Sequence, residues 1–261
     1  MTDSPQTDQP LAHPSKLITV ASGKGGVGKT WLSITLAHAF ASKGRKVLLF
    51  DGDLGLANVD IQLGVTPDRD LGAVITGDAT LAEVTTSYAA GKDSFDIIPG
   101  RSGSGSLGNL NRDMLAKLRS GLIQQTADYD HVLLDLAAGI DPSVLTLSRH
   151  TGTLLVVMTA DPTSLTDAYA FIKMTAGRNS PARVRIVVNN VPSEREGKQA
   201  YEKIRKVCEG FLKISPELAG IIHRDDRVMD AIRTQIPLLV RHPQSVAAQD
   251  VLRLSETLSN S

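Results

Sequence analysis

Eight consecutive residues have the composition of a phosphate-binding loop. Residues 23–30 fit the pattern G-x-x-x-x-G-K-[ST] at every position. Glycines let successive backbone N–H groups converge on an anion, and a helix that begins here adds its positive end. Lys29 is expected to reach the β- and γ-phosphates, and the Thr30 hydroxyl to join a Mg²⁺ shell. The stretch predicts nucleotide binding through Gly23, Lys24, Gly25, Gly26, Val27, Gly28, Lys29 and Thr30.

Two residues in or beside this loop are not needed for holding phosphate. Lys24 adds a second cation near the start of the loop, and Trp31 places an indole directly after the threonine. A surface lysine can simply extend its ammonium group into water, so Lys24 can also be an ordinary loop residue without a functional role. Trp31 is a candidate nucleotide contact beside the ribose, with a subunit interface or ordinary packing as alternatives.

Three aspartates are placed to complete a nucleotide site. Asp135 ends an apolar segment, where a carboxylate can hold a metal ion through water. Asp51 and Asp53 end another such segment, and residues i and i+2 of a strand point the same way. One of them can orient the attacking water while the other supports the metal shell, although either one can merely cap its loop. The predicted metal-side residues are Thr30, Asp51 and Asp135.

Short apolar segments alternate with longer helical ones along the chain. This rhythm is typical of βαβ units, whose parallel strands are buried on both faces. It predicts an α/β fold with a doubly wound, mainly parallel sheet flanked by helices. We expect a flexible leader at 1–15 and a single domain at 16–261. Strands are predicted at 16–22, 45–51, 95–100, 130–136, 153–159, 183–190 and 218–223, with helices that include 163–176, 195–213, 225–234 and 244–258.

The composition argues against a disulfide-rich, a membrane-spanning or a secreted protein. The chain has 261 residues, no net charge and one cysteine, Cys208, which excludes a disulfide framework and any cluster that needs two cysteines from one chain. No apolar run approaches the roughly 20 residues of a membrane-spanning helix. The polar leader lacks the apolar core of a secretory signal. We therefore expect a cytoplasmic protein.

The order of these motifs resembles the MinD/ParA family of P-loop ATPases, also called the deviant Walker A family. The resemblance rests on the blocks "KGGVGKT", "FDGDLGLANVDIQLG", "LLDLAAGID" and "VVNNV", and it extends over about residues 16–258. Within the family, the segments "AAGIDPSVLTLSR" and "PTSLTDAYAFIK" look like those of the flagellar-number ATPases, the FlhG/FleN type.

The resemblance implies a slow, dimer-dependent ATPase that uses ATP/ADP and Mg²⁺. Two molecules would face each other across two nucleotides, and Lys24 of each would reach the partner's ATP. Lys29 would serve its own nucleotide, and Asp53 would position the lytic water. Asp135 would be the Walker B aspartate. The resemblance also implies adenine contacts by Asn189 and the region of Asp225, and γ-phosphate-sensing switches at 51–60 and 135–141.

The same resemblance implies a regulator of flagellar placement or number that forms a homodimer on binding ATP. Its partners would be an FlhF-type GTPase, a flagellar transcription regulator or a switch-complex protein. The leader keeps Asp8 and Gln9 of the element that stimulates such a GTPase, but Pro10 departs from it. A ParA-type partitioning ATPase that binds DNA nonspecifically is the alternative, and a nucleotide-bound scaffold without hydrolysis is a further one.

Two charge patterns bear on membrane and DNA binding. Arg253 is the only basic residue among 244–261, whereas a membrane-surface helix needs a cationic polar face. The apolar stripe of this segment, formed by Ala247, Val251, Leu254 and Leu258, is therefore predicted to dock on the sheet, and direct membrane binding is not expected.

Residues 183–241 hold twelve Lys or Arg against eight Asp or Glu. Helix-surface solvation explains this excess, with phosphate contacts to DNA as the alternative.

Overall fold

The computed structural model describes residues 16–100, 110–150, 152–175 and 182–259, so the predicted leader lies outside the described residues. Within them the chain forms an eight-stranded sheet in the order β3-β4-β2-β5-β1-β6-β7-β8. All neighbouring pairs are parallel except β3 and β4. The strands are β1 (Leu17–Ser22), β2 (Val47–Gly52), β3 (Thr86–Ala90), β4 (Asp93–Ile98), β5 (His131–Ala138), β6 (Thr153–Met158), β7 (Arg183–Val191) and β8 (Glu217–His223).

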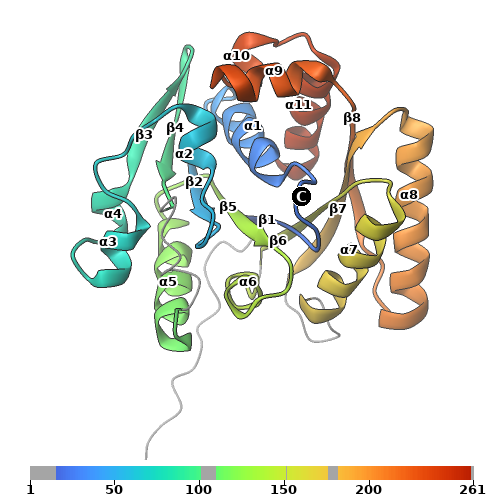
Figure 1. The fold of residues 1–261 in the computed structure, drawn as a ribbon, viewed down its shortest axis with the longest axis horizontal. Coiled ribbons are helices and arrows are strands. Elements are labelled where there is room, and N and C mark those ends of the chain that lie inside the picture. Colours follow the sequence, from blue (N-terminus) through green and yellow to red (C-terminus); the bar gives the residue numbers. More distant parts are fainter. Residues whose placement is uncertain (1–15, 101–109, 151, 176–181, 260–261) are drawn as a thin grey trace, which may run out of the picture.

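Helices cover both faces of the sheet, with α1, α9, α10 and α11 on one side and α5, α6 and α7 on the other (Figure 1). Two apolar clusters fill the spaces between the sheet and these layers. The predicted fold class is confirmed. The helices are α1 (Lys29–Ala41), α2 (Val59–Leu63), α3 (Leu71–Thr76), α4 (Leu81–Val84), α5 (Arg112–Gln125), α6 (Pro142–Leu147), α7 (Pro162–Thr175), α8 (Glu194–Val207), α9 (Asp226–Thr234), α10 (Leu238–Arg241) and α11 (Val246–Ser259).

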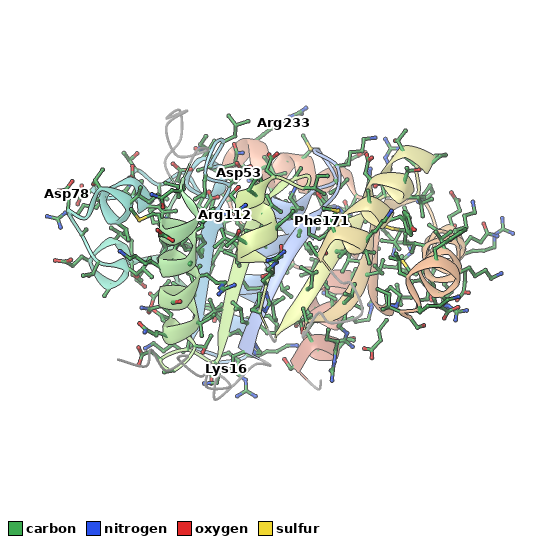
Figure 2. All side chains as sticks on the ribbon, turned by 90° about the horizontal axis from the view of Figure 1, so that it is seen from below. Lys16, Asp53, Asp78, Arg112, Phe171 and Arg233 are labelled. Atoms are coloured by element: carbon green, nitrogen blue, oxygen red, sulfur yellow. The ribbon has the colours of Figure 1, made fainter. Side chains whose placement is uncertain are left out.

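The parallel strands bring their carboxyl ends to one edge of the sheet. Asp53 follows β2 and lies at this edge, whereas Lys16, just before β1, lies at the opposite one (Figure 2). β5 pairs with both β1 and β2, so Asp135 of β5 stands between the phosphate loop and the segment after β2. In open α/β sheets, ligands bind outside the carboxyl ends of the strands. The topology therefore collects the predicted site residues at one edge.

The structure contains one strand, β3, that the sequence pattern does not predict. β3 pairs antiparallel with β4 through a turn at Gly91, whose φ is 68°. β3 has the sequence TSYAA and is largely exposed at the sheet edge. An edge strand of this kind lacks the apolar run that marks the buried parallel strands, so the pattern did not reveal it. Two short helices, α3 and α4, precede this strand.

The last helix docks as its apolar stripe predicts. Ala247, Val251, Leu254 and Leu258 are all buried, and α11 packs against α1 and β8. Among the described residues, no helix is both long enough and apolar enough to cross a membrane.

Candidate nucleotide-binding site

The phosphate loop joins β1 to α1, as the motif requires. Gly26 and Gly28 have φ values of 75° and 91°, a backbone region that residues with a Cβ rarely adopt. Gly28 is the N-cap of α1, so the first N–H groups of that helix open onto the loop. Gly25 and Gly26 are exposed, whereas Val27 is buried and anchors the loop to the core. The loop therefore has the conformation and the accessible N–H groups that bind phosphate.

Neighbouring elements hold the loop from two sides. The amide Nδ2 of Asn189, on β7, donates to the carbonyl of Val27 at 2.8 Å. On the other side, a Cβ at Gly23 would lie 2.0 Å from the carbonyl oxygen of Asp167 on α7. The Ser22 hydroxyl closes the start of the loop by donating to the carbonyl of Lys24 at 2.7 Å. Contacts with β7 and α7, together with one local hydrogen bond, thus fix the position of the loop.

Lys29 and Asp135 form the buried centre of the site. Lys29 is 9% exposed, and burial lowers the pKa of its ammonium group while the charges of Asp135 and Asp53 oppose that shift. Asp135 is fully buried, and its burial raises the pKa of its carboxyl group to about 6. Hydrogen bonds from the Thr30 and Ser33 hydroxyls and the charge of Lys29 favour the ionised form of this carboxylate. The positive charge of Lys29 and the hydroxyl donors therefore all act on the Asp135 carboxylate beside the loop.

The oxygen atoms of Thr30 and Asp135 suit a magnesium ion. Mg²⁺ prefers oxygen ligands and takes one or two from protein, with water and phosphate oxygens completing its shell. The described residues contain no group of three or more His, Cys, Asp or Glu side chains that could hold a metal on their own. The Thr30 hydroxyl favours the ionised form of the Asp135 carboxylate beside the phosphate loop, so this pair of oxygen donors fits a magnesium ion bound together with a nucleotide.

Asp51 lies next to Asp135 in the sheet, but its side chain is engaged elsewhere. Its Oδ2 accepts from the backbone N–H groups of Asn58 and Val59, both at 2.9 Å, and its Oδ1 accepts from Asp53 N at 3.2 Å. Burial and the charge of Asp135 raise the pKa of its carboxyl group to about 7. Asp51 therefore fixes the loop after β2 and the start of α2. Its predicted place in a metal shell stays a prediction.

Asp53 and Lys24 lie at the accessible rim of the site. Asp53 Oδ1 accepts from the N–H groups of Gly55 and Leu56, at 3.3 and 2.9 Å, which closes a tight turn after β2. The ammonium group of Lys24 donates to the hydroxyl of Thr163, in the first turn of α7, at 2.8 Å. Lys24 is thus held against α7 by Thr163, a partner that the sequence pattern does not predict.

The two predicted adenine contacts have structural partners. Asn189 braces the phosphate loop as described above, and a Cβ on Gly28 would lie 2.5 Å from its Nδ2 atom. Asp225 caps α9 by accepting from Arg227 N at 3.0 Å, and its other oxygen accepts from Ala247 N, in the first turn of α11, at 3.3 Å. Asn189 therefore lies beside the nucleotide loop, whereas Asp225 joins two helices. Adenine contact by either residue stays a prediction.

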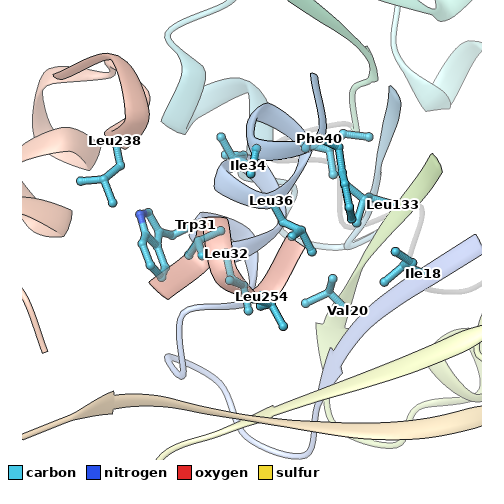
Figure 3. Packing of buried hydrophobic residues seen from close by; sticks show 14 of the residues in the cluster. Ile18, Val20, Trp31, Leu32, Ile34, Leu36, Phe40, Leu133, Leu238 and Leu254 are labelled. Carbon is cyan, nitrogen blue, oxygen red and sulfur yellow. The ribbon is translucent and has the colours of Figure 1, made fainter. Parts of the chain in front are cut away.

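Trp31 lies in the core rather than at the surface. It is 6% exposed and belongs to the same apolar cluster as Leu238 and Leu254 (Figure 3). Its indole N–H is buried and has no hydrogen-bond partner among the described residues. This position favours the packing alternative over contact with the ribose.

Truncating Trp31 should therefore act mainly on stability. We expect Trp31→Ala to lower the free energy of unfolding by about 3–5 kcal/mol, measured by urea denaturation. Trp31→Phe should cost much less, because it keeps most of the apolar volume and removes a buried N–H without a partner. If Trp31→Phe kept its stability but bound nucleotide several-fold more weakly, the ribose contact would be the correct assignment.

Comparisons with known proteins agree with this geometry. The model of the CobQ/CobB/MinD/ParA nucleotide binding domain matches residues 18–238. The antiactivator FleN of Pseudomonas aeruginosa is 39% identical over 90% of this chain and 83% of its own length. The flagellum site-determining protein YlxH of Helicobacter pylori is 32% identical over 94% of this chain and 82% of its own.

Two solved structures share the fold. The cell division ATPase MinD of Pyrococcus furiosus superposes with a TM-score of 0.78 at 25% identity, covering 94% of this chain and 99% of its own. The septum site-determining protein MinD of Pyrococcus horikoshii, solved with Mg-ADP, gives 0.75 at 26% identity, covering 92% of this chain and 94% of its own. The phosphate loop, the sheet topology and these matches together show that the chain belongs to the MinD/ParA family of P-loop ATPases.

Proposed function

We propose that this protein is an ATP-driven dimerisation switch that regulates the placement or number of flagella. The similarity to FleN, over 90% of the chain, supports a regulatory role, because that relative is named as an antiactivator. The similarity to YlxH, which is named for determining flagellar sites, carries the flagellar part of the proposal. A cytoplasmic location is part of the proposal.

Each part of the site would have a defined task in ATP hydrolysis. Backbone N–H groups of the loop and the ammonium of Lys29 bind the phosphates. Asp53, which is half-buried after β2, orients the attacking water. The Thr30 hydroxyl and the Asp135 carboxylate would hold a magnesium ion, which when bound neutralises phosphate charge. This assignment requires no cofactor beyond ATP and Mg²⁺.

Dimerisation would complete the site. Lys24 sits at the rim, held by Thr163 on α7, and would act on the nucleotide of a second copy of the chain. The two proposed switch segments also expose apolar side chains, Leu56 at 71% and Ile140 at 46% exposure. Apolar side chains exposed on segments that respond to γ-phosphate are suited to an interface formed only in the ATP state.

Ion pairs engage five of the twelve basic residues in the segment that raised the DNA alternative. Within 183–241, several cations have acidic partners within 4 Å, which lowers the number free for phosphate contacts. These pairs are Arg185–Glu217, Lys198–Glu194, Arg205–Glu202, Arg205–Glu209, Arg227–Asp225 and Arg241–Asp230. We therefore retain the flagellar regulator as the proposal.

Light scattering on the full chain tests the switch. We expect a monomer with ADP and a dimer with ATP and Mg²⁺, most clearly in Asp53→Ala, which should bind ATP without hydrolysing it. A monomer under every condition would overturn the dimer mechanism.

In the flagellated host, deleting the gene should change the number or position of flagella seen by electron microscopy. Unchanged flagella, together with ATP-dependent, salt-sensitive retention on DNA in gel shifts, would instead favour a ParA-type partitioning role.

A further inference from the structure

A serine on the second turn of α1 contacts the metal-side carboxylate. Ser33 is fully buried, and its hydroxyl lies 3.1 Å from Oδ1 of Asp135 and 3.0 Å from the carbonyl oxygen of Lys29. Ser33 follows Lys29 by four residues, so both occupy the same face of the helix. The residue that binds phosphate and the residue that contacts the carboxylate are therefore carried by one rigid element.

The hydroxyl of Ser33 has one hydrogen and two acceptors within reach. Bonding to the carbonyl four residues earlier is the usual choice of a serine inside a helix. A carboxylate is the stronger acceptor, because a hydrogen bond to an ionised group is about twice as strong as a neutral one. Asp135 is 1% exposed, so water cannot satisfy both its oxygens. The carboxylate therefore competes well for this hydrogen.

We propose that Ser33 is a positioning residue that fixes the Asp135 carboxylate for metal binding. Thr30, on the first turn of α1, also favours the ionised form of this carboxylate, so side chains from two successive turns of one helix act on it. A buried carboxylate whose Oδ1 accepts a hydrogen bond from a rigid helix presents its remaining lone pairs in one direction. This role rests on the proposed function, in which Asp135 supports the magnesium ion of a bound nucleotide.

The same helix offers a matched control. The hydroxyl of Thr35 donates to the carbonyl of Trp31 at 2.8 Å, the same four-residue bond that Ser33 makes to Lys29. Thr35 is also buried. Thr35→Val and Ser33→Ala each remove a buried helical hydroxyl while nearly conserving shape, but only Ser33→Ala removes a donor from Asp135. A difference between these variants therefore reports on the carboxylate rather than on the helix.

Manganese binding to the full-length protein with ADP tests the proposal. We expect Ser33→Ala to raise the Kd for Mn²⁺, measured by electron paramagnetic resonance, by about 10-fold or more, as for other groups that orient metal ligands. ADP affinity in EDTA should stay unchanged, Thr35→Val should bind Mn²⁺ like the wild type, and Ser33→Thr should recover affinity.

Equal Mn²⁺ affinity in Ser33→Ala and the wild type would overturn the positioning role while leaving the proposed function intact. An equal loss of ADP affinity in EDTA would also overturn it, because that result indicates a general structural effect. A wild-type protein that bound no Mn²⁺ with ADP would refute the metal-nucleotide site itself, and the two failures are thereby distinguished.

Discussion

Replacing Lys24 by alanine is expected to lower ATP turnover by about a thousandfold or more while leaving ATP affinity nearly unchanged. The magnitude follows from cations that a partner supplies to a transferring phosphoryl group. The Lys24 ammonium is bonded to Thr163 on α7, so a lone chain binds ATP through the rest of the loop. Phosphate release and calorimetric titration with a non-hydrolysable ATP analogue measure the two quantities.

Lys29→Ala is the matched comparison for this prediction. Lys29 is buried beside Asp135 and Asp53, so its loss should weaken both nucleotide binding and hydrolysis. Normal hydrolysis by Lys24→Ala would show that the second lysine has no part in the reaction.

Mixing two inactive variants separates action on the partner from action on the same chain. In a dimer of Lys24→Ala with Asp53→Ala, one nucleotide keeps its own Asp53 and receives Lys24 from the other subunit. Mixing should therefore restore hydrolysis if Lys24 acts across the interface. If Lys24 served its own nucleotide, each site of the mixed dimer would lack one group and activity would stay absent.

The phosphate loop was predictable because its chemistry is local. The glycine spacing fixes the backbone conformation, and Gly26 and Gly28 adopt the positive φ values that explain their identity. The apolar runs of the parallel strands were equally clear, since both faces of these strands are buried. Strand-end aspartates could be placed at one edge because parallel strands share a direction.

The partners of these residues could not be predicted, because they come from distant parts of the chain. Asn189 reaches the carbonyl of Val27 from β7, and Thr163 reaches Lys24 from α7. Asp51 could be placed at the sheet edge from its spacing, but the three backbone N–H groups of the following loop and α2 that donate to its oxygens could not be predicted. A pattern of residue types shows which groups are available, whereas tertiary packing decides which of them face the ligand.

Helix α1 connects stability and function in this fold. Its first turn carries Lys29 and Thr30, its second turn carries Ser33, and nearly all its side chains are buried. Trp31 and Leu32, between these functional residues, belong to an apolar cluster that α11 also joins. Because site and core share one helix, a change that shifts α1 should alter phosphate and metal contacts together. The contact of the phosphate loop with α7 is a second place where a change in packing should alter both stability and phosphate binding.

Replacing Gly23 by alanine is expected to lower the free energy of unfolding by about 3 kcal/mol and to weaken nucleotide binding strongly. The new Cβ would lie 2.0 Å from the carbonyl oxygen of Asp167 and 2.9 Å from the N atom of Ala168. These are backbone atoms of α7, so no flexible side chain can move aside, and either the loop or the helix must shift. A shifted loop no longer directs its N–H groups at one phosphate.

Gly25 provides the control within the same loop. A Cβ there would meet no atom within 4 Å, and the backbone of Gly25 is not in the left-handed region. Gly25→Ala should therefore change the free energy of unfolding by no more than about 0.5 kcal/mol, as at other unstrained surface positions. Urea denaturation compares the two variants, and titration with ADP and Mg²⁺ follows binding. Equal stability of Gly23→Ala and Gly25→Ala would contradict a close contact between the loop and α7. Any loss of ADP affinity in Gly23→Ala would then come from the contacts between the loop and the phosphates themselves.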